Sequence, residues 1–483
     1  MLGVRRITAL AAAVLALAVF NLTFRLGSEG LTEWDESLYA TSALEMVRSH
    51  DWVATTFDGA IDYSNSKPPL NVWLLALSLK TFGVSLVSLR LASIAAAALT
   101  VLVLLVWAWR RFSPLVGTLS AFVLATCFGF LHVHSGRTAN PDALLTLLLL
   151  LIVIVLDASR EAPIRRVWLG PLLAGIFLLK GMAFVMPLLL IAFMELRRLR
   201  RRENPESRIA SPAWLPLALG CAIGAVPVAA WAIARWQVDG WMFFERVFYQ
   251  DFVNLSTTPL DGQSGSPLFY LNILQKHHYD WMVAALTAVI LFPPPSWVPL
   301  RRSLKFWAAD DDLTALLGAW TLIALLVPSL MQTKMPWYLN AFYPIFALGV
   351  GWVLAYGFSR VSFAPSHHRG LLVAMIAMAS VFAEAKLIWY SYNYRAFDRT
   401  AQGLLLFEED RLRGARVYRS AWDRADSFVL KRLVQAEQAE AINVQDFLFR
   451  SSPGEYFLTT RDVDDPRLVQ VAVVGNYGLY QRR

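Results

Sequence analysis

The stretch LASIAAAALTVLVLLVWAW, residues 91–109, decides the fold class, because its 19 residues are predominantly apolar and carry no charge. An α-helix needs about 20 apolar residues to cross the roughly 30 Å hydrocarbon core of a bilayer. The stretch ends at Arg110-Arg111, and basic residues at the end of a transmembrane helix indicate its cytoplasmic side. We therefore predict a transmembrane helix that reaches the cytoplasm at Arg110.

Ten further apolar runs occur along the chain: 7–24, 114–133, 141–156, 167–179, 182–194, 212–234, 281–300, 313–331, 336–358 and 370–390. The 483 residues are 57% hydrophobic and 17% charged, whereas soluble domains average about 45–50% apolar and about 25% charged residues. This composition excludes a soluble multidomain enzyme. We predict a polytopic α-helical membrane protein with about 11 spans.

The distribution of basic residues orients these spans. The predicted cytoplasmic segments are 1–6, 110–113, 157–166, 195–211, 301–312 and 359–369, and together they contain 18 Lys and Arg residues. The longer outer loops contain 11. A further apolar segment, 68–83, contains Lys80 and would invert this asymmetry if it crossed the membrane. We therefore predict that it is an interfacial or re-entrant helix within a long outer loop, 25–90.

The first run is predicted to remain as a helix with a cytoplasmic amino terminus, because 7–24 is longer than the apolar part of a signal peptide. Many basic residues flank apolar helices, so the net charge of +8 reflects the orientation of the helices in the membrane rather than a basic surface. We therefore expect no nucleic-acid partner, and we expect a multi-pass protein of the plasma (inner) membrane.

The chain divides into a transmembrane domain, 1–390, and a polar segment, 391–483. This segment contains 14 Lys and Arg and 13 Asp and Glu residues, as a soluble domain would. With 11 spans it lies outside the cytoplasm. We predict a small α/β domain with strands at 416–420, 456–460 and 469–474 and a helix at 426–441.

Candidate chemistry begins in the outer loop 25–90. Asp35-Glu36 closely follows the first helix and lies beside Trp34 and Tyr39. Carboxylates at the membrane boundary can serve as a general base or a metal ligand, although most acids of this loop can simply be solvated. Lys67 precedes two prolines, and is either an interfacial anchor or a point charge for a lipid phosphate.

Two other outer segments carry polar residues. His132 and His134 suggest a metal only weakly, and we favour a polar cap; Asp142 falls in the first turn of the next helix. Lys180-Gly181 and Thr333-Lys334 interrupt apolar regions. If these lysines converged with Lys67 and Arg137, they would form an anion site. His277-His278 lacks a third ligand, and Cys127 and Cys221 show no zinc spacing.

An ordered set of motifs from about residue 30 to residue 350 resembles the GT-C membrane glycosyltransferases. The set comprises Trp34-Asp35-Glu36 with Tyr39, Lys67-Pro68-Pro69-Leu70, Arg90-Leu91, Arg137 with Asp142, Lys180-Gly181, and Lys334-Met335-Pro336-Trp337-Tyr338 with Pro344. The nearest groups are the bacterial members of the protein O-mannosyltransferase family and the aminoarabinose transferases that modify lipid A.

This resemblance implies an enzyme that uses a sugar carried on a polyprenyl phosphate at the outer face of the membrane. It implies that Asp35 is the catalytic acid that deprotonates or orients the acceptor hydroxyl, with inversion at the anomeric carbon, and that Glu36 and Tyr39 support it. The implied ligands of the lipid phosphate are Lys67, Arg137, Lys334 and Tyr338, and Asp142 matches a second acidic position.

The sequence departs from the aminoarabinose enzymes at Ser66, where those enzymes have an acidic residue before the lysine. No metal ligand is therefore assigned, no cofactor is certain, and a divalent metal stays open. The acceptor is open among lipid A, another envelope glycan and protein Ser or Thr hydroxyls. The alternatives to a transferase are a transporter or flippase of a lipid-linked sugar, and a non-catalytic scaffold.

Overall fold

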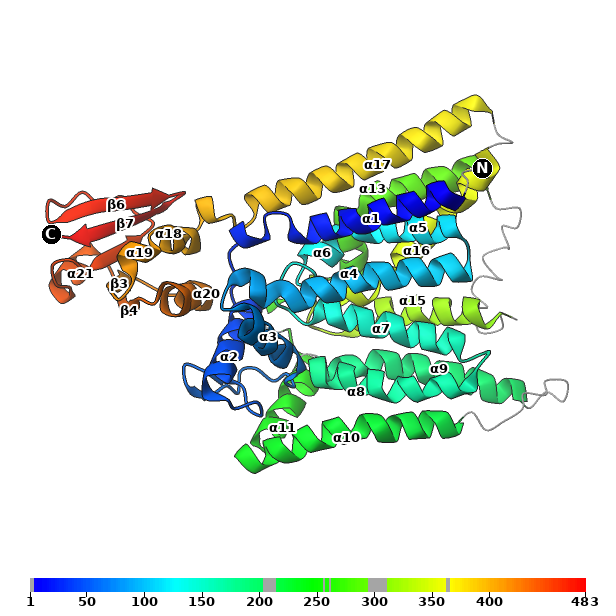
Figure 1. Ribbon diagram of the computed structural model, residues 1–483, viewed down its shortest axis with the longest axis horizontal. Coiled ribbons are helices and arrows are strands. Elements are labelled where there is room, and N and C mark those ends of the chain that lie inside the picture. The colour runs from blue at the N-terminus through cyan, green and yellow to red at the C-terminus, as the bar shows by residue number, and fades with distance from the viewer. Residues whose placement is uncertain (1–3, 203–213, 255–256, 260–261, 294–310, 362–364) are drawn as a thin grey trace.

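The computed structural model describes residues 4–202, 214–254, 257–259, 262–293, 311–361 and 365–483. Long helices lie side by side, and a small sheet domain is attached at one end of them (Figure 1). The bundle helices are α1 (Val4–Thr23), α4 (Leu86–Arg111), α5 (Pro114–Ala125), α7 (Asp142–Ala158), α8 (Leu169–Lys180), α9 (Val185–Arg202), α10 (Trp214–Asp239), α13 (Phe269–Leu291), α15 (Asp312–Leu330), α16 (Tyr343–Arg360) and α17 (Ser366–Asn393). Parts of the predicted basic segments 195–211 and 301–312, and the end of the predicted run 281–300, lie outside the described residues.

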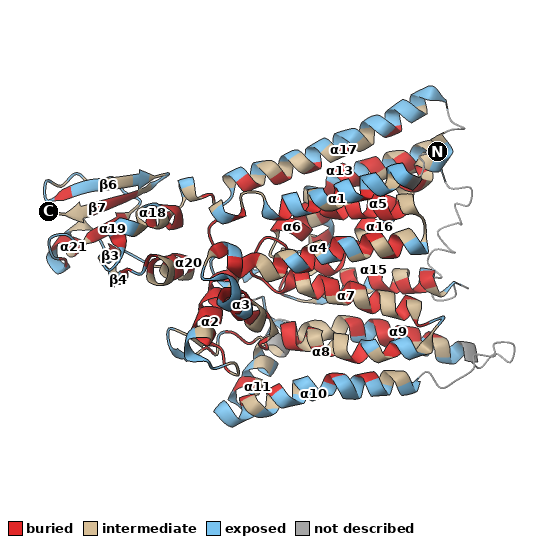
Figure 2. Cartoon of the chain, viewed as in Figure 1, coloured by how far each residue is buried: buried red, intermediate tan, exposed pale blue. Residues whose placement is uncertain are grey.

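Within the described chain, six segments are long and apolar enough to cross a membrane: Arg5–Ser28, Leu86–Arg111, Pro163–Arg200, Trp214–Asp239, Asp312–Leu330 and Ser366–Asn393. The outer helices α10 and α17 are exposed along much of their length (Figure 2). Their exposed residues include Leu219, Val226 and Val381. Helices that present apolar side chains outward are suited to contact with lipid. The structure therefore confirms a mostly helical, multi-pass membrane protein.

The predicted run 114–133 is interrupted in the structure. Helix α5 ends at Ala125, and the short helix α6 (Phe128–His132) follows it. Thr126 lies at the break, where its hydroxyl donates to the Phe122 carbonyl oxygen (2.9 Å) and accepts from the Trp281 indole (3.1 Å). A similar break separates α8 from α9 at the 3-10 turn η3 (Gly181–Phe184). These breaks create turns in which polar side chains can meet.

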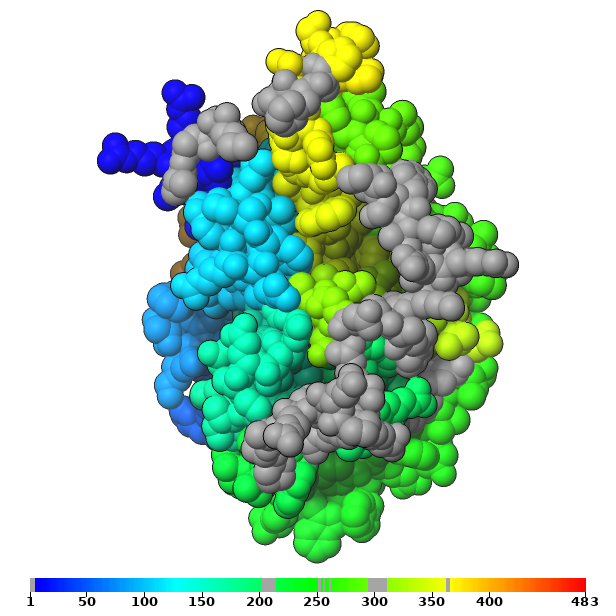
Figure 3. Space-filling model, turned by 90° about the vertical axis from the view of Figure 1, so that its right-hand side faces the viewer, coloured from blue at the N-terminus to red at the C-terminus, as the bar shows by residue number. Residues whose placement is uncertain are grey.

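The outer loop 25–90 folds into two helices, α2 (Asp35–Ser49) and α3 (Leu70–Phe82), joined through a two-stranded hairpin of β1 (Thr56–Phe57) and β2 (Ala60–Ile61). Both helices lie at the end of the bundle that faces the sheet domain (Figure 1). Their apolar faces pack together through buried residues such as Leu44 and Leu75. The predicted helix 68–83 thus corresponds to α3. The opposite end of the bundle, seen in Figure 3, is formed by the other ends of the long helices.

The C-terminal domain contains a five-stranded sheet in the order β4-β3-β5-β7-β6. Its strands are β3 (Arg416–Arg419), β4 (Glu437–Glu440), β5 (Tyr456–Thr459), β6 (Leu468–Val474) and β7 (Tyr477–Arg482). Its helices are α18 (Ala401–Phe407), α19 (Glu409–Leu412), α20 (Arg424–Phe428), the π-helix η10 (Val429–Val434) and α21 (Val444–Arg450). The three predicted strands are present as β3, β5 and β6, while β7 and α21 are additional.

The predicted helix 426–441 is wrong in its second half. The helical part ends at Val434, where Gln435 adopts a left-handed conformation (φ 62°) that stops the helix. Residues Glu437–Glu440 instead form an edge strand parallel to β3. Backbone pairing with β3 selects this conformation, because a four-residue edge strand with few apolar side chains has no strong pattern of its own.

The C-terminal domain is held against the outer loop by polar contacts. The buried Gln402 amide pairs with the backbone of Leu31, accepting at 2.8 Å and donating at 3.1 Å. Arg432 of η10 forms an ion pair with Glu45 of α2 (2.7 Å). These contacts place α20 and η10 beside the start of the outer loop.

Candidate active site

Four charged side chains form a continuous chain at the end of the bundle that carries α2. The His134 imidazole lies between Asp35 (Nε2 to Oδ2, 3.2 Å) and Asp142 (Nδ1 to Oδ2, 3.1 Å). The other carboxylate oxygen of Asp142 accepts from the Lys180 ammonium at 2.7 Å. The Asp35 side chain is 44% exposed, whereas that of Asp142 is 2% exposed. Asp35 is therefore the member of the chain that a substrate can reach.

Three members of this chain stand at the end of a helix, and His134 lies in the loop between α6 and α7. Asp35 and Asp142 are the first residues of α2 and α7, where the positive end of the helix dipole favours a carboxylate. Lys180 is the last residue of α8, where a cation is favoured. Trp34 (φ 68°) precedes Asp35 in a strained backbone conformation. Strain of this kind concentrates at functional sites, where the surrounding structure enforces it.

The charges of these groups support one another. Burial raises the pKa of Asp35, but the hydrogen bond and charge of His134, with the charges of Lys180 and Lys67, bring it below its usual value. Burial lowers the pKa of His134, but hydrogen bonds and charges from Asp142 and Asp35 raise it above the usual value. Both shifts favour a carboxylate paired with an imidazolium at neutral pH.

Aromatic residues of the 3-10 helix η7 (Pro336–Ala341) cover the same site. The Trp337 ring stacks on the His134 imidazole, with centroids 4.1 Å apart and planes 12° from parallel. The Lys180 ammonium lies 5.9 Å from the centroid of the Tyr338 ring. Asn340 donates to the Val133 carbonyl oxygen (3.3 Å), which ties η7 to the segment before His134. This packing fixes the ring plane of His134.

Lys67 lies on another side of Asp35. Its side chain is half-buried, its ammonium lies 3.4 Å from the Ser66 hydroxyl, and its charge contributes to the lowered pKa of Asp35. Its backbone N–H donates to the Asn65 side chain (3.2 Å) in the turn that leads to Pro68 and α3. The structure thus brings Lys67 close enough to Asp35 for their charges to interact.

Glu36 points away from this chain into the protein. Its carboxylate accepts from Arg90 Nε (2.8 Å), from the Thr32 N–H (2.7 Å) and from the Ala139 N–H (3.0 Å). Although burial raises its pKa, the charges of Arg90 and Arg395 lower it to about 2. Glu36 therefore ties α2 to α4 and to the loop before α7. Tyr39, one turn further along α2, is buried in the contact with α3.

Arg137 and Lys334 are buried, and both donate hydrogen bonds to backbone carbonyl oxygens. Arg137 pairs with Glu29 and donates to the carbonyl oxygens of Asn21 (2.6 Å) and Phe24 (2.8 Å) at the end of α1. Lys334 donates to the carbonyl oxygens of Pro328, Ser329 and Met331 at the end of α15. Cations that bind the last carbonyls of a helix satisfy groups without an intrahelical partner.

Of the predicted residues, the structure brings Asp35, Asp142, Lys67 and Tyr338 around one site, while Glu36, Tyr39, Arg137 and Lys334 contact other groups. From the sequence, His134 is predicted to belong to a polar cap rather than to a site, and Lys180 is predicted to join an anion site only if several lysines converge. Both residues lie beside predicted outer turns, and this position is the only hint in the sequence that they belong to the site. The fold is needed to show that His134 and Lys180 both contact Asp142.

The histidines do not assemble a metal site. His132 stacks on Phe128 (centroids 5.4 Å apart), while His134 faces two carboxylates. His278 lies 3.8 Å from the Cys127 sulfur, measured to Nε2. Among the residues that the structure describes, no group of three or more His, Cys, Asp or Glu side chains could hold a metal ion.

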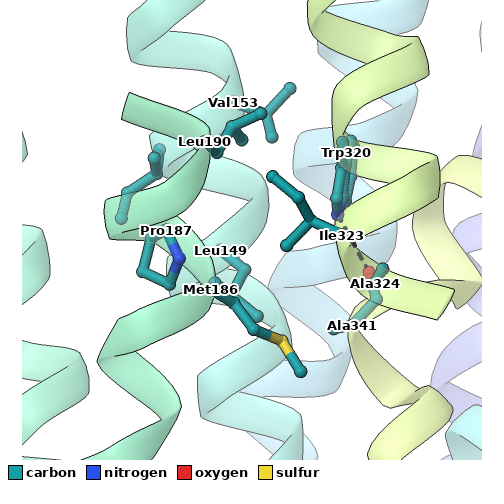
Figure 4. A pocket seen from close by; sticks show the side chains of 10 residues that line it. Leu149, Val153, Met186, Pro187, Leu190, Trp320, Ile323, Ala324 and Ala341 are labelled. Atoms are coloured by element: carbon teal, nitrogen blue, oxygen red, sulfur yellow. Dashed lines mark hydrogen bonds between the residues drawn. The ribbon is translucent and has the colours of Figure 1, made fainter. Parts of the chain in front are cut away.

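A small apolar cavity of about 20 Å³ lies between α7, α9, α15 and η7 (Figure 4). Leu149, Val153, Met186, Trp320 and Ala341 contribute to its lining. Ala341 ends η7, the helix that also carries Tyr338. The cavity therefore adjoins the element that covers the polar site.

Comparison with known proteins relates the whole arrangement to membrane glycosyltransferases. The family model for dolichyl-phosphate-mannose-protein mannosyltransferase matches residues 66–231. The undecaprenyl phosphate-alpha-4-amino-4-deoxy-L-arabinose arabinosyl transferase of Pseudomonas paraeruginosa is 28% identical over 386 residues, which are 76% of this chain and 64% of that protein. Its counterpart in Aeromonas salmonicida is 26% identical, over 75% of this chain and 70% of that protein. The chain thus spans less than two thirds of the length of the Pseudomonas relative.

Solved structures show the same fold. The crystal structure of ArnT from Cupriavidus metallidurans in the apo state matches with a TM-score of 0.66 and 14% identity, and 98% of each chain is covered. The oligosaccharyltransferase of Archaeoglobus fulgidus in its apo form matches with a TM-score of 0.57 and 10% identity, over 89% of this chain and 64% of that one. The chain is thus similar in sequence to the arabinosyl transferases and to part of the mannosyltransferase family model, and it shares its fold with ArnT and the oligosaccharyltransferase.

Proposed function

We propose that the protein is a glycosyltransferase that moves a sugar from a polyprenyl phosphate to an acceptor hydroxyl at the outer face of the membrane. The observation that carries the proposal is the exposed carboxylate of Asp35, which His134 holds in place beside two lysines. Support comes from the arabinosyl transferases that match most of the chain, whose named donor is an undecaprenyl phosphate sugar.

Asp35 is proposed as the general base. Its carboxylate takes the proton of the acceptor hydroxyl while that oxygen bonds to the anomeric carbon, and the bond from that carbon to the phosphate oxygen breaks. The sugar is inverted in this single displacement, and polyprenyl phosphate leaves with the electron pair. The imidazolium of His134 keeps Asp35 ionised and oriented, so we propose His134 as a positioning residue. Asp142 and Lys180 in turn hold His134.

We propose that Lys67 and Tyr338 contact the phosphate of the donor. A lysine ammonium and a tyrosine hydroxyl can donate to phosphate oxygens, and a cation stabilises the charge that develops as the phosphate leaves. For Arg137 and Lys334 we propose a supporting role instead, because the two terminal nitrogens of Arg137 and the Lys334 ammonium already bind Glu29 and backbone carbonyls. These two residues would shape the site by fixing the ends of α1 and α15.

The donor lipid is proposed to enter from the bilayer beside η7, where the helices leave a small apolar cavity (Figure 4). The cavity is lined by apolar side chains and lies next to the element that carries Tyr338. A phosphate at Tyr338 would therefore place the first isoprene units close to this cavity.

We further propose 11 spans, formed by α1, α4, α5, α7, α8, α9, α10, α13, α15, α16 and α17. The amino terminus would lie in the cytoplasm, and domain 391–483 would lie outside the plasma membrane. The predicted asymmetry of basic residues supports this orientation. So does the position of the amino terminus at the end of the bundle opposite the C-terminal domain (Figure 1).

For the acceptor we infer lipid A or another envelope glycan in preference to a protein hydroxyl. The relatives that match about three quarters of the chain are arabinosyl transferases, whereas the protein mannosyltransferase family model matches only residues 66–231.

The proposal is tested by transfer of radiolabelled sugar from polyprenyl phosphate to lipid A in proteoliposomes. We expect Asp35→Asn to lower kcat by about 10²–10⁴-fold, the usual contribution of a general base. Glu33→Gln is the matched control, because this nearby carboxylate is exposed, and it should transfer at the wild-type rate. Wild-type rates in Asp35→Asn would refute the assigned role. Movement of the lipid-linked sugar across the vesicle without a glycosylated product would support a transporter instead.

A further inference from the structure

A second cavity, of about 170 Å³, lies between the outer loop and the C-terminal domain, and we call it the inter-domain cavity. Thr41 and Phe57 line it from the outer loop, and Trp422, Arg424, Lys431 and Gln438 line it from the C-terminal domain. Aromatic rings and cations therefore face the same space. No step of the proposed reaction uses any of these residues.

Arg424 is the uncommitted cation of this cavity. Its guanidinium carbon lies over the rings of Trp34 and Phe57, at 5.0 Å and 5.4 Å from their centroids. Within the part of the chain that the structure describes, no carboxylate lies within 4 Å of it and no hydrogen bond engages it. The N–H donors of a guanidinium point outward from its edge, where they can bind a planar or tetrahedral anion.

The other charged residues of the cavity have partners. Lys431 pairs with Asp58 (3.2 Å), and Arg432 pairs with Glu45 (2.7 Å). Asp423 accepts from the Asp426 N–H (2.7 Å) at the start of α20. The acids of the cavity are thus used in ion pairs or in capping a helix, and they do not neutralise Arg424.

Gln438 supplies a second polar group that lacks a partner. Its side-chain oxygen is buried and makes no hydrogen bond, although the residue lines the cavity. Buried polar atoms in folded proteins nearly always have a partner, so an unsatisfied one at a cavity wall indicates a ligand or a water. A hydroxyl of a bound molecule could donate to this oxygen.

The cavity is also close to the proposed general base. Trp34, whose ring contacts Arg424, is the residue before Asp35 and is 59% exposed. Thr41 lies six residues after Asp35 in α2, which corresponds to about 9 Å along the helix axis. A saccharide anchored in the cavity can therefore extend toward Asp35.

We propose that the inter-domain cavity binds the phosphorylated saccharide head of the acceptor. Arg424 would bind the phosphate, Phe57 and Trp422 would contact the faces of the sugar, and Gln438 would accept from a hydroxyl. The C-terminal domain would then select the acceptor while the bundle binds the donor. This inference rests on the proposed transferase function, because it identifies the acceptor of that reaction.

The test measures the affinity of the full-length protein in nanodiscs for lipid A that carries its phosphates, for the same lipid A after dephosphorylation, and for undecaprenyl phosphate. We expect Arg424→Gln to weaken binding of phosphorylated lipid A about tenfold, as loss of one charge-assisted hydrogen bond would. Binding of undecaprenyl phosphate should stay unchanged. The exposed Arg413→Gln of the same domain is the matched control and should bind both lipids like the wild type.

Competition distinguishes a sugar phosphate from phosphate alone. We expect glucosamine 1-phosphate to displace lipid A from the wild type but not from Arg424→Gln, and inorganic phosphate at equal concentration to be ineffective. Equal competition by inorganic phosphate would overturn the saccharide part of the proposal. The proposed site would be overturned if Arg424→Gln bound phosphorylated lipid A with wild-type affinity. It would also be overturned if the variant lost as much affinity for dephosphorylated lipid A, or for undecaprenyl phosphate, as for phosphorylated lipid A. None of these results depends on Asp35, so they leave the proposed reaction to its own assay.

Discussion

His134 lies between two carboxylates that belong to different helices, and this position explains the electrostatics of the site. Without the imidazolium, the partly exposed Asp35 and the buried Asp142 would disfavour each other's ionisation. With it, Asp35 stays ionised while its exposed face remains open to a substrate. The stacking of Trp337 limits the rotation of the imidazole. One side chain therefore controls both the charge and the direction of the proposed base.

The first prediction concerns His134→Gln. We expect kcat to fall about 10²-fold, because a misplaced catalytic group costs about that much. Burial then raises the pKa of Asp35 with less opposition, so the acid limb of the pH profile of kcat should move to higher pH. The measurement is the transfer rate against pH for wild type and variant. An unshifted acid limb would show that His134 does not hold the charge of Asp35.

The same pair predicts how pH affects the wild type. The pKa of His134 is raised, so its contribution to stability is complete below its usual value of about 6.5 and is lost as the pH rises through the raised value. The pKa of Asp35 is lowered, so its contribution is present at neutral pH and is lost as the pH falls through the lowered value. The thermal unfolding midpoint of the wild type should therefore fall as the pH rises through the pKa of His134. We expect the midpoint of His134→Gln not to show this fall at alkaline pH.

At this scale the sequence predicts which residue types lie at the outer boundary but not their pairing. Asp35, Asp142 and Lys67 were identified from motifs and helix ends. His134 was not, because its partners come from three other segments of the chain, and a contact between distant segments has no local pattern. Arg137 and Lys334 show the converse, since a buried lysine or arginine that binds carbonyl oxygens resembles an anion site in the sequence.

At the scale of elements, the contact between α8 and α10 depends on glycine. A Cβ atom on Gly224 would lie 2.4 Å from the Gly170 carbonyl oxygen, and one on Gly220 would lie 2.3 Å from the Val167 carbonyl oxygen. Glycines spaced four residues apart let helix backbones approach closely in membranes. Because α10 is largely exposed elsewhere (Figure 2), this contact is a main attachment of α10 to the bundle.

We therefore expect Gly224→Val to destabilise the protein by about 1–3 kcal/mol, the usual cost of overpacking. The neighbouring atoms are backbone and cannot move aside easily. The thermal unfolding midpoint in detergent measures the effect. Gly349→Ala in α16 is the control, because a Cβ there meets nothing within 4 Å. Equal midpoints for the two variants would contradict the glycine contact.

The link between α2 and α4 gives another prediction. Arg90 binds the Glu36 carboxylate and also donates to the carbonyl oxygens of Leu26, Glu29 and Gly30, so one buried side chain fixes the outer loop. Arg90→Met should cost about 3–5 kcal/mol, because it leaves Glu36 buried with less compensation. Thermal unfolding again provides the measurement. A loss below 1 kcal/mol, the range of surface pairs, would show that this pair is dispensable.

Elements were predictable where composition alone determines them. Apolar runs of sufficient length correspond to the bundle helices, because only helices satisfy backbone polar groups in a bilayer. The break at Thr126 was missed, since its surroundings are as apolar as a continuous helix. The strand at Glu437–Glu440 was predicted as helix, because its conformation depends on pairing with β3.

At the scale of the whole molecule, the two ends of the helix bundle differ in what they carry. The outer loop, the four-residue charge chain and the C-terminal domain share one end, while the amino terminus lies at the other (Figures 1 and 3). A transferase that meets its donor in the membrane and its acceptor outside would need this polarity. The fold class was predictable from hydropathy, whereas the position of the C-terminal domain over α2 follows from contacts such as Gln402 with Leu31.

The proposed orientation predicts which residues react with a membrane-impermeant maleimide. In a chain with Cys127 and Cys221 replaced by alanine, a cysteine at position 461 should be labelled in intact spheroplasts, because Arg461 is exposed in the C-terminal domain. A cysteine in place of the exposed Arg110, at the far end of α4, should be labelled only after permeabilisation. Labelling of position 110 in intact cells would reverse the proposed topology.

Mass spectrometry of polyprenyl phosphates, lipid A, envelope glycans and glycoproteins tests the proposed function most directly. It compares cells that lack the protein with cells in which the wild type or Asp35→Asn is restored. We expect the deletion to remove one sugar from a single glycan and to accumulate the corresponding polyprenyl phosphate sugar. The wild type should reverse both changes, and Asp35→Asn should reverse neither. Unchanged profiles in cells where the protein is made, or full restoration by Asp35→Asn, would contradict transfer by this site.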